Sequence, residues 1–347
     1  MRFFPPYSLL IVAGAFRSAS CIPLDSRTQE LYNPALAAVT SSTTTGMNTR
    51  QTATNGTATM APPYFVIYAA EGEGPPPVAN LTGFNVVCLT FLYANGTTAQ
   101  WSPAAAWQNL PASQRASVKA EYAKAGIKLF ISVFGSLDWP ATEGADPTNT
   151  ATTIANWAKQ YDVDGVDVDY EDFGAIGKGT GEQWVIDFTT QLSKDLGGNY
   201  LISHSPIAGW FNATGPGLPG GGYRTVDKAV GSLINWYNVQ FYNAPYLYTT
   251  CDHLLAESNG TWANSHLASQ TSVFEIHEYA QVPLDKIVIG KPVTLHDAGG
   301  SYMNGTYLGT CIQQAKQDDW NAGIMFWQYS NVSSTMIQEA RSLAFPL

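Results

Sequence analysis

The segment from Asp164 to Glu171, with the sequence Asp-Gly-Val-Asp-Val-Asp-Tyr-Glu, places four carboxyl groups within eight positions. Asp167, Asp169 and Glu171 alternate with two valines and a tyrosine. This period of two predicts a strand whose successive side chains point to opposite faces. The three carboxyl groups then share one face, where they repel one another. A fold keeps such a cluster where the site does chemistry or holds a cation.

The spacing of the surrounding residues argues against a metal, a cofactor or a bound phosphate. A calcium loop needs an interior glycine, and Asp172 stands at that position. His277-Glu278 is followed by Tyr-Ala-Gln, which breaks the zinc-protease pattern, and residues 177–180 lack the spacing of a phosphate loop. His204 is expected to lie in the wall of the fold. We therefore predict no metal and no cofactor.

Carboxyl acid–base chemistry remains. Burial among like charges raises the pKa of a carboxyl group, which can then stay protonated and act as a general acid. Glu171 ends the acidic strand, so we assign the proton to it, with Asp169 and Asp167 deeper on the same face as a coupled pair. The chain is 12% aromatic with only 17 lysines and arginines, which suits sugar rings better than phosphates. Carboxyl groups beside a sugar can act at a glycosidic bond.

Strands and helices alternate along the chain. Eight strand-like segments with intervening helical segments favour a single-domain (β/α)₈ barrel, with a doubly wound open sheet as the alternative. Thr180 and Gln183 form a capping-box pattern, and residues 215–222 are expected to form a mobile rim loop. The expected strands are 64–68, 84–92, 128–134, 164–171, 201–205, 235–242, 286–291 and 323–327, and the expected helices are 112–125, 152–161, 180–196, 273–279, 306–317 and 334–343.

The termini and the composition indicate an extracellular protein. Residues 1–20 resemble a secretory signal, residues 21–60 are Ser/Thr-rich and expected to be disordered, and residues 61–347 form the catalytic domain. The net charge of −10 argues against nucleic acid or an anionic membrane as a partner. Glycosylation sequons support secretion; they begin at Asn55, Asn80, Asn95, Asn212, Asn259, Asn304 and Asn331.

The four cysteines show no metal-binding spacing. Cys88 lies in an apolar strand and is expected to be a buried free thiol. Cys251 and Cys311 are predicted to form a disulfide. Cys21 is left unassigned.

The acidic segment matches the Asp-x-x-Asp-x-Asp-x-Glu signature of glycoside hydrolase family 18, and the chain resembles that family over roughly residues 64–345. The run from Trp236 to Asn243 resembles the sixth strand of small class III chitinases from plants and fungi, and Ser205-Pro206 and Trp327 also fall where that family places them. One departure is Phe134, where the family usually has glycine. We expect Phe134 to reshape the floor of the site.

The resemblance implies a retaining mechanism in which the substrate's 2-acetamido oxygen attacks the anomeric carbon. Glu171 would protonate the leaving oxygen, Asp169 would accept the acetamido N–H, Asp167 would share a proton with Asp169, and Tyr242 would donate its hydroxyl. Trp327 would form the floor under the sugar and precede a cis peptide. The residues predicted to bind substrate are Trp327, Gln240, Asn243 and Tyr68.

The substrate is left open between two classes. Residues 291–323 leave no room for the α+β insertion domain of larger family members, so a shallow groove and endo cleavage are expected. Chitin is the leading substrate, and the chitobiose core of N-glycans is the alternative. A chitin-binding lectin is disfavoured because Glu171 is present. The protein is expected to be a secreted monomer.

Overall fold

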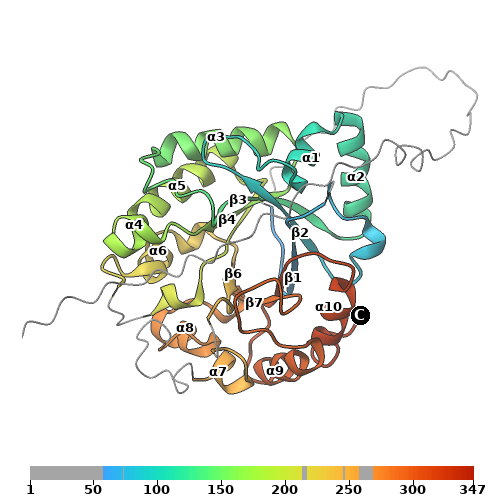
Figure 1. The fold of residues 1–347 in the computed structure, drawn as a ribbon, viewed down its shortest axis with the longest axis vertical. Coiled ribbons are helices and arrows are strands. Elements are labelled where there is room, and N and C mark those ends of the chain that lie inside the picture. Colours follow the sequence, from blue (N-terminus) through green and yellow to red (C-terminus); the bar gives the residue numbers. More distant parts are fainter. Residues whose placement is uncertain (1–57, 73, 213–216, 245–246, 258–268) are drawn as a thin grey trace, which may run out of the picture. The chain divides into compact units, whose positions relative to one another are not determined.

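Eight parallel strands close into a barrel in the order β1 to β8, and helices surround it (Figure 1). The computed structural model describes residues 58–72, 74–212, 217–244, 247–257 and 269–347. The predicted (β/α)₈ barrel is confirmed, and the open-sheet alternative is excluded because β1 pairs with β8. The predicted signal segment and almost all of the Ser/Thr-rich segment lie outside the described residues.

Most strand residues alternate between the inside and the outside of the barrel wall. Ser132 on β3 lies opposite Asp167 on β4, which in turn lies opposite Ser203 on β5. At the point of closure, a Cβ on Gly323 would lie 2.0 Å from the carbonyl oxygen of Tyr64, so this position requires glycine. The strands are β1 Tyr64–Ala69, β2 Val86–Leu92, β3 Lys128–Gly135, β4 Gly165–Tyr170, β5 Leu201–His204, β6 Trp236–Gln240, β7 Ile287–Pro292 and β8 Gly323–Trp327.

Most of the helices follow the strand before them and pack on the outside of the barrel (Figure 1). Their apolar faces contribute to one continuous core with the outward-facing strand residues. The α-helices are α1 Pro103–Asn109, α2 Ala112–Lys124, α3 Pro147–Gln160, α4 Phe173–Lys178, α5 Gly181–Leu196, α6 Gly222–Val230, α7 Cys251–Leu255, α8 Val273–Ala280, α9 Gly305–Gln317 and α10 Ser333–Arg341.

Two local predictions are wrong. Thr180 precedes α5, but its hydroxyl donates to the carbonyl of Ala175 at 3.3 Å and does not cap the helix. A capping box forms instead at α8, where Ser272 and Glu275 bond to each other's backbone N–H groups. The described part of the predicted loop, residues 217–221, is a loop, but it was expected to precede no helix, and α6 begins at Gly222. Helices α1, α4 and α7 are only five to seven residues long and too short to give a clear periodic signal. Helix α6 buries Tyr223, Val226 and Val230 at helical spacing, so its signal was present and was missed.

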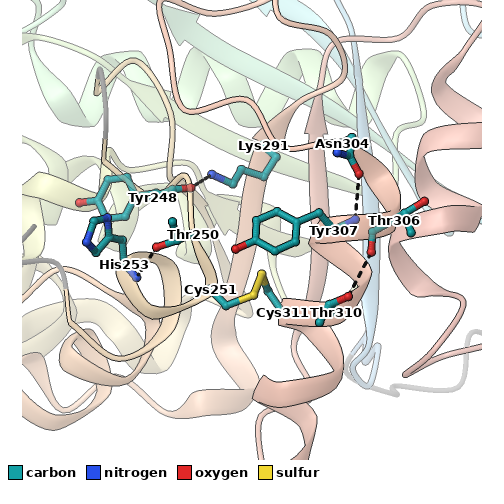
Figure 2. The surroundings of a disulfide bond; sticks show 10 residues. All are labelled: Tyr248, Thr250, Cys251, His253, Lys291, Asn304, Thr306, Tyr307, Thr310 and Cys311. Atoms are coloured by element: carbon teal, nitrogen blue, oxygen red, sulfur yellow. Dashed lines mark hydrogen bonds between the residues drawn. A yellow bond between two sulfur atoms is a disulfide. The ribbon is translucent and has the colours of Figure 1, made fainter.

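The cysteine predictions are confirmed. Cys251 at the start of α7 and Cys311 in α9 form a disulfide with their Cα atoms 4.9 Å apart (Figure 2). Cys88 is a buried free thiol on β2. Between β7 and β8 the chain holds only loop and α9, so no insertion domain is present there. Within the described residues, no helix combines the length and the apolar character needed to cross a membrane.

Candidate active site

The acidic strand β4 presents its carboxyl groups to the interior of the barrel, as predicted. Asp167 is fully buried and Asp169 is 4% exposed. Glu171 follows the last strand residue, Tyr170, at the rim formed by the carboxyl ends of the strands. This rim carries the active site in (β/α)₈ enzymes. The depth order inferred from the alternation, with Glu171 outermost, is therefore confirmed.

Asp167 sits in a cage of five donors. Its Oδ2 accepts hydrogen bonds from the hydroxyls of Tyr68 at 2.7 Å, Ser132 at 2.8 Å and Ser205 at 2.7 Å. Its Oδ1 accepts from Ser203 Oγ at 2.6 Å and Asn238 Nδ2 at 3.0 Å. Burial raises the pKa of Asp167, and the hydrogen bonds from the four hydroxyls lower it. A carboxylate surrounded by donors on four different strands is held in one orientation.

Gln240 links the other two carboxyl groups. Its Nε2 donates to Asp169 Oδ1 at 2.9 Å and lies 3.3 Å from Glu171 Oε1. Burial, then the charges on Glu171 and Asp167, raise the pKa of Asp169 well above its usual value. Burial also raises the pKa of Glu171, and the hydrogen bond from Gln240 lowers it. A Glu171 that keeps its proton can act as a general acid.

The Asp167 oxygens are fully engaged by other groups. None of the hydrogen bonds between described residues joins Asp167 to Asp169. The sharing of a proton between these two carboxyl groups stays a prediction.

Aromatic side chains line the site beside the carboxyl groups. Trp327 ends β8 and lies 5.7 Å from the ring of Tyr68 and 6.0 Å from the ring of Phe91, measured between centroids. The predicted cis peptide after Trp327 is present. Tyr242 is 6% exposed, and burial together with the charges on the three carboxyl groups raises its pKa well above its usual value. Its hydroxyl is therefore a donor at any ordinary pH.

Besides Gln240, two more of the residues predicted to bind substrate form hydrogen bonds within the protein. Tyr68 is buried, and its hydroxyl bonds to Asp167 and to Ser205. Asn243 is exposed at the rim, and its Oδ1 accepts the N–H of Gly299 at 2.7 Å. Tyr68 thus helps to hold the Asp167 carboxylate in place. Contact with substrate stays a prediction for Tyr68 and for Asn243.

The expectation that Phe134 reshapes the floor of the site is wrong. Phe134 lies opposite Asp169 on the neighbouring strand, where alternation alone would turn its ring inward. Its φ of 76° breaks the alternation. The ring instead packs outside the barrel against Tyr170, Trp184 and Phe188, with centroid distances of 6.3, 5.7 and 5.2 Å. The ring therefore does not enter the site.

Phe134→Ala is therefore expected to affect stability and not catalysis. Removing a buried aromatic ring costs about 3–5 kcal/mol in free energy of unfolding, while kcat should stay within about threefold of the original value, because the ring does not enter the site. Urea unfolding and steady-state kinetics measure the two effects. Phe188→Ala, in the same aromatic cluster, is the matched control. A large loss of kcat in Phe134→Ala but not in Phe188→Ala would show that Phe134 does shape the floor of the site.

Several supporting residues were not singled out from the sequence. Ser132, Ser203 and Asn238 all stand on the inward parity of otherwise apolar strands, next to Asp167. A polar residue at inward parity is the signal that could have identified them. Phe91 carried no such signal, because an aromatic residue on a strand is ordinary core.

His204 lies in the wall of the barrel on β5, as expected. His204 faces away from the site and lies near Thr189 and Tyr223, at 3.3 and 3.2 Å. Burial lowers its pKa to about 3, so it is neutral. Among the described residues, no group of three or more His, Cys, Asp or Glu side chains is arranged to hold a metal ion.

Comparison with proteins of known sequence finds chitinases. A chitinase from Enterococcus faecalis is 26% identical over 257 residues, which cover 70% of each chain. Endochitinase 4 from Metarhizium robertsii is 26% identical over 268 residues, 71% of this chain and 73% of that one. No protein-family model matches the chain.

Comparison with solved structures finds the same barrel. A family 18 chitinase from Pseudoalteromonas aurantia superposes with a TM-score of 0.64 at 25% identity, covering 81% of this chain and 99% of that chain. A fungal endo-β-N-acetylglucosaminidase of family 18 superposes with a TM-score of 0.59 at 16% identity, covering 81% and 98% of the two chains. At that identity, the second likeness concerns the fold alone.

Proposed function

We propose that this chain, which its relatives identify as a glycosidase of glycoside hydrolase family 18, cleaves β-1,4 bonds next to N-acetylglucosamine in chitin. The observation that supports the proposal most is the inward-facing ladder of Asp167, Asp169 and Glu171, with Gln240 bonded to the upper two carboxyl groups. Chitin is preferred because two relatives of similar length are named chitinase and endochitinase.

The proposed reaction has two steps. In the first, the substrate's acetamido oxygen bonds to the anomeric carbon as the bond to the leaving oxygen breaks, and Glu171 gives its proton to that oxygen. In the second, the Glu171 carboxylate takes a proton from water as the water oxygen attacks the anomeric carbon. The bond between that carbon and the acetamido oxygen breaks, which opens the five-membered ring formed in the first step. Two inversions at one carbon retain its configuration, without a protein nucleophile.

The other groups act on charge and position. The acetamido group becomes positively charged in the intermediate, and the Asp169 carboxylate can accept its N–H and balance that charge. Tyr242 can donate its hydroxyl to the same group. Trp327 offers a partly exposed aromatic surface at the end of β8, against which the apolar face of a sugar can pack.

The chitobiose core of N-glycans is the second candidate. It has the same β-1,4 bond between two N-acetylglucosamine units, so it needs the same catalytic groups with different loops. The lack of an insertion between β7 and β8 favours an open groove that could accept a branched or protein-linked substrate.

The two candidates are separated by one experiment. The purified protein is incubated with chitin oligosaccharides and, separately, with a high-mannose glycoprotein, and the products are identified by mass spectrometry. Shortened oligosaccharides of N-acetylglucosamine support chitin as the substrate. Release of intact glycan without cleavage of chitin would overturn that choice in favour of the N-glycan core.

We further propose that the protein is a secreted, glycosylated monomer. Among the described sequons, Asn80, Asn95, Asn304 and Asn331 are exposed, whereas Asn212 is 2% exposed and has no room for a glycan. Expression with its own N-terminus in a eukaryotic secretory host should place the activity in the medium. Enzymatic deglycosylation should lower its mass, and light scattering after size exclusion should give the mass of one chain.

A further inference from the structure

Lys291 is a buried lysine on β7 that the proposed reaction does not use. Its side chain is 0% exposed. Its Nζ donates to three backbone carbonyls, those of Phe241 at 3.0 Å, Tyr248 at 2.6 Å and Ser301 at 2.9 Å. Figure 2 shows the side chain directed at the Tyr248 carbonyl, near the disulfide of α7 and α9. One side chain thus joins the loops that follow β6 and β7.

The three contacts match the chemistry of a charged ammonium group. An ammonium has three N–H donors and no acceptor, and here each donor has one carbonyl. A neutral amine would have only two. No carboxylate of the described residues forms an ion pair with Lys291, and burial lowers its pKa well below the usual value. A buried charge without a counter-ion is costly, so these carbonyls must replace its hydration.

The first of these carbonyls belongs to the peptide that leads into Tyr242. The C=O of Phe241 and the N–H of Tyr242 are parts of the same planar unit. Holding that carbonyl therefore fixes the peptide plane from which Tyr242 starts and restricts the directions in which its side chain can leave the backbone. The rim beyond it is also tied to the β7 loop, because Ser301 Oγ donates to the Ala244 carbonyl at 2.6 Å.

The Tyr242 hydroxyl has no such anchor. None of the hydrogen bonds among the described residues involves it, although the side chain is 6% exposed. Its position is thus set by packing and by its backbone. A donor left free in this way can bond to a substrate without first breaking a bond to the protein.

From this geometry we infer that Lys291 is a positioning residue that aims Tyr242 at the substrate by holding the peptide between Phe241 and Tyr242. The inference rests on the role proposed above for Tyr242. The new element is that Lys291, whose side chain lies outside the barrel wall, sets the position of the Tyr242 hydroxyl inside it. Lys291 itself does not touch the substrate.

The test is a double-mutant cycle between Lys291→Met and Tyr242→Phe, because such a cycle isolates the interaction of two sites. The soluble substrate is the oligosaccharide that the unaltered protein cleaves best. Lys291→Met should lower kcat about tenfold or more with KM changed less than about threefold, the pattern of an interaction made in the transition state. In the Tyr242→Phe background, the same change should lower kcat by less than about threefold, because the hydroxyl it aims is already gone.

Lys286→Met is the matched control. Lys286 lies just before the N-terminal end of β7, whereas Lys291 lies near its C-terminal end. The Nζ of Lys286 also donates to backbone carbonyls, those of Gly231 at 2.8 Å and Ile234 at 2.7 Å. Its replacement should lower the unfolding temperature and leave kcat unchanged. If Lys291→Met does not fold, the cycle is run with Lys291→Gln, which keeps two N–H donors, and with Lys291→Arg, which keeps the charge and should be closer to the original kcat.

The outcomes separate the two proposals. Equal loss of kcat from the lysine change in both backgrounds would show that Lys291 acts independently of Tyr242 and would overturn the inference. An unaltered kcat in Tyr242→Phe would contradict the role of Tyr242 itself, and with it the inference. If Lys291→Met lowers kcat in the original protein but not in Tyr242→Phe, the result supports the proposed roles of both Tyr242 and Lys291.

Discussion

Glu171→Gln is expected to lower kcat at least about 10³-fold on an oligosaccharide substrate, within the range for removal of a positioned acid–base group. Glutamine keeps the size of the side chain but has no proton to give to the leaving oxygen. Burial raises the pKa of Glu171, so the native group is protonated over a wider pH range than an exposed glutamate. The loss should appear in kcat and in kcat/KM alike.

The leaving group makes this test specific for proton donation. A dinitrophenolate leaves without being protonated, so the loss on a dinitrophenyl glycoside should be at least about tenfold smaller than on a sugar leaving group. Glu143→Gln is the matched control, because Glu143 is an exposed glutamate in the loop between β3 and α3. Near-normal turnover of the oligosaccharide by Glu171→Gln would remove Glu171 from the mechanism.

The alternation of the acidic strand carried most of what could be predicted. A period of two fixes which side chains share a face, so it placed Asp167, Asp169 and Glu171 together before any other strand was known. The order of the strands then put Glu171 at the rim, because the carboxyl ends of parallel strands meet at one end of a barrel. Both inferences depend on backbone geometry alone, and both are confirmed.

The rest could not be predicted, because it depends on contacts between distant strands or on an uncommon backbone conformation. The cage around Asp167 draws donors from β1, β3, β5 and β6, and no local pattern specifies which oxygen each one reaches. Phe134 follows the parity of an inward residue, but its positive φ turns the ring outward. Positive φ is uncommon for a bulky residue, so the alternation was the reasonable guide and was wrong here.

The carboxyl ladder also costs stability. Asp169 is buried between two other carboxyl groups, and its pKa in the folded protein lies well above its usual value. Each unit of such a shift corresponds to about 1.4 kcal/mol of differential free energy between the protonation states. In the pH range between the unfolded and folded pKa values, the folded protein binds more protons than the unfolded chain. Stability therefore falls as pH rises through that range.

Asp169→Asn should consequently reduce activity and raise stability. Loss of one preorganised group that balances charge in the intermediate should lower kcat about 10²–10³-fold. At pH 7 the variant should unfold at a higher temperature than the native protein, because asparagine carries no charge to bury. As pH falls toward about 4, where an unfolded aspartate takes up its proton, the difference should close.

Asp167→Asn gives the contrasting result that makes this prediction sharp. Asp167 accepts five hydrogen bonds, and an amide in its place would turn an N–H₂ group toward some of those donors. That variant should unfold at a lower temperature than the native protein at pH 7. Thermal unfolding of the three proteins from pH 4 to pH 8 measures both effects. If Asp169→Asn is destabilised at pH 7 as Asp167→Asn is, the Asp169 carboxyl is stabilised by its surroundings, and the repulsion within the ladder is not what limits stability.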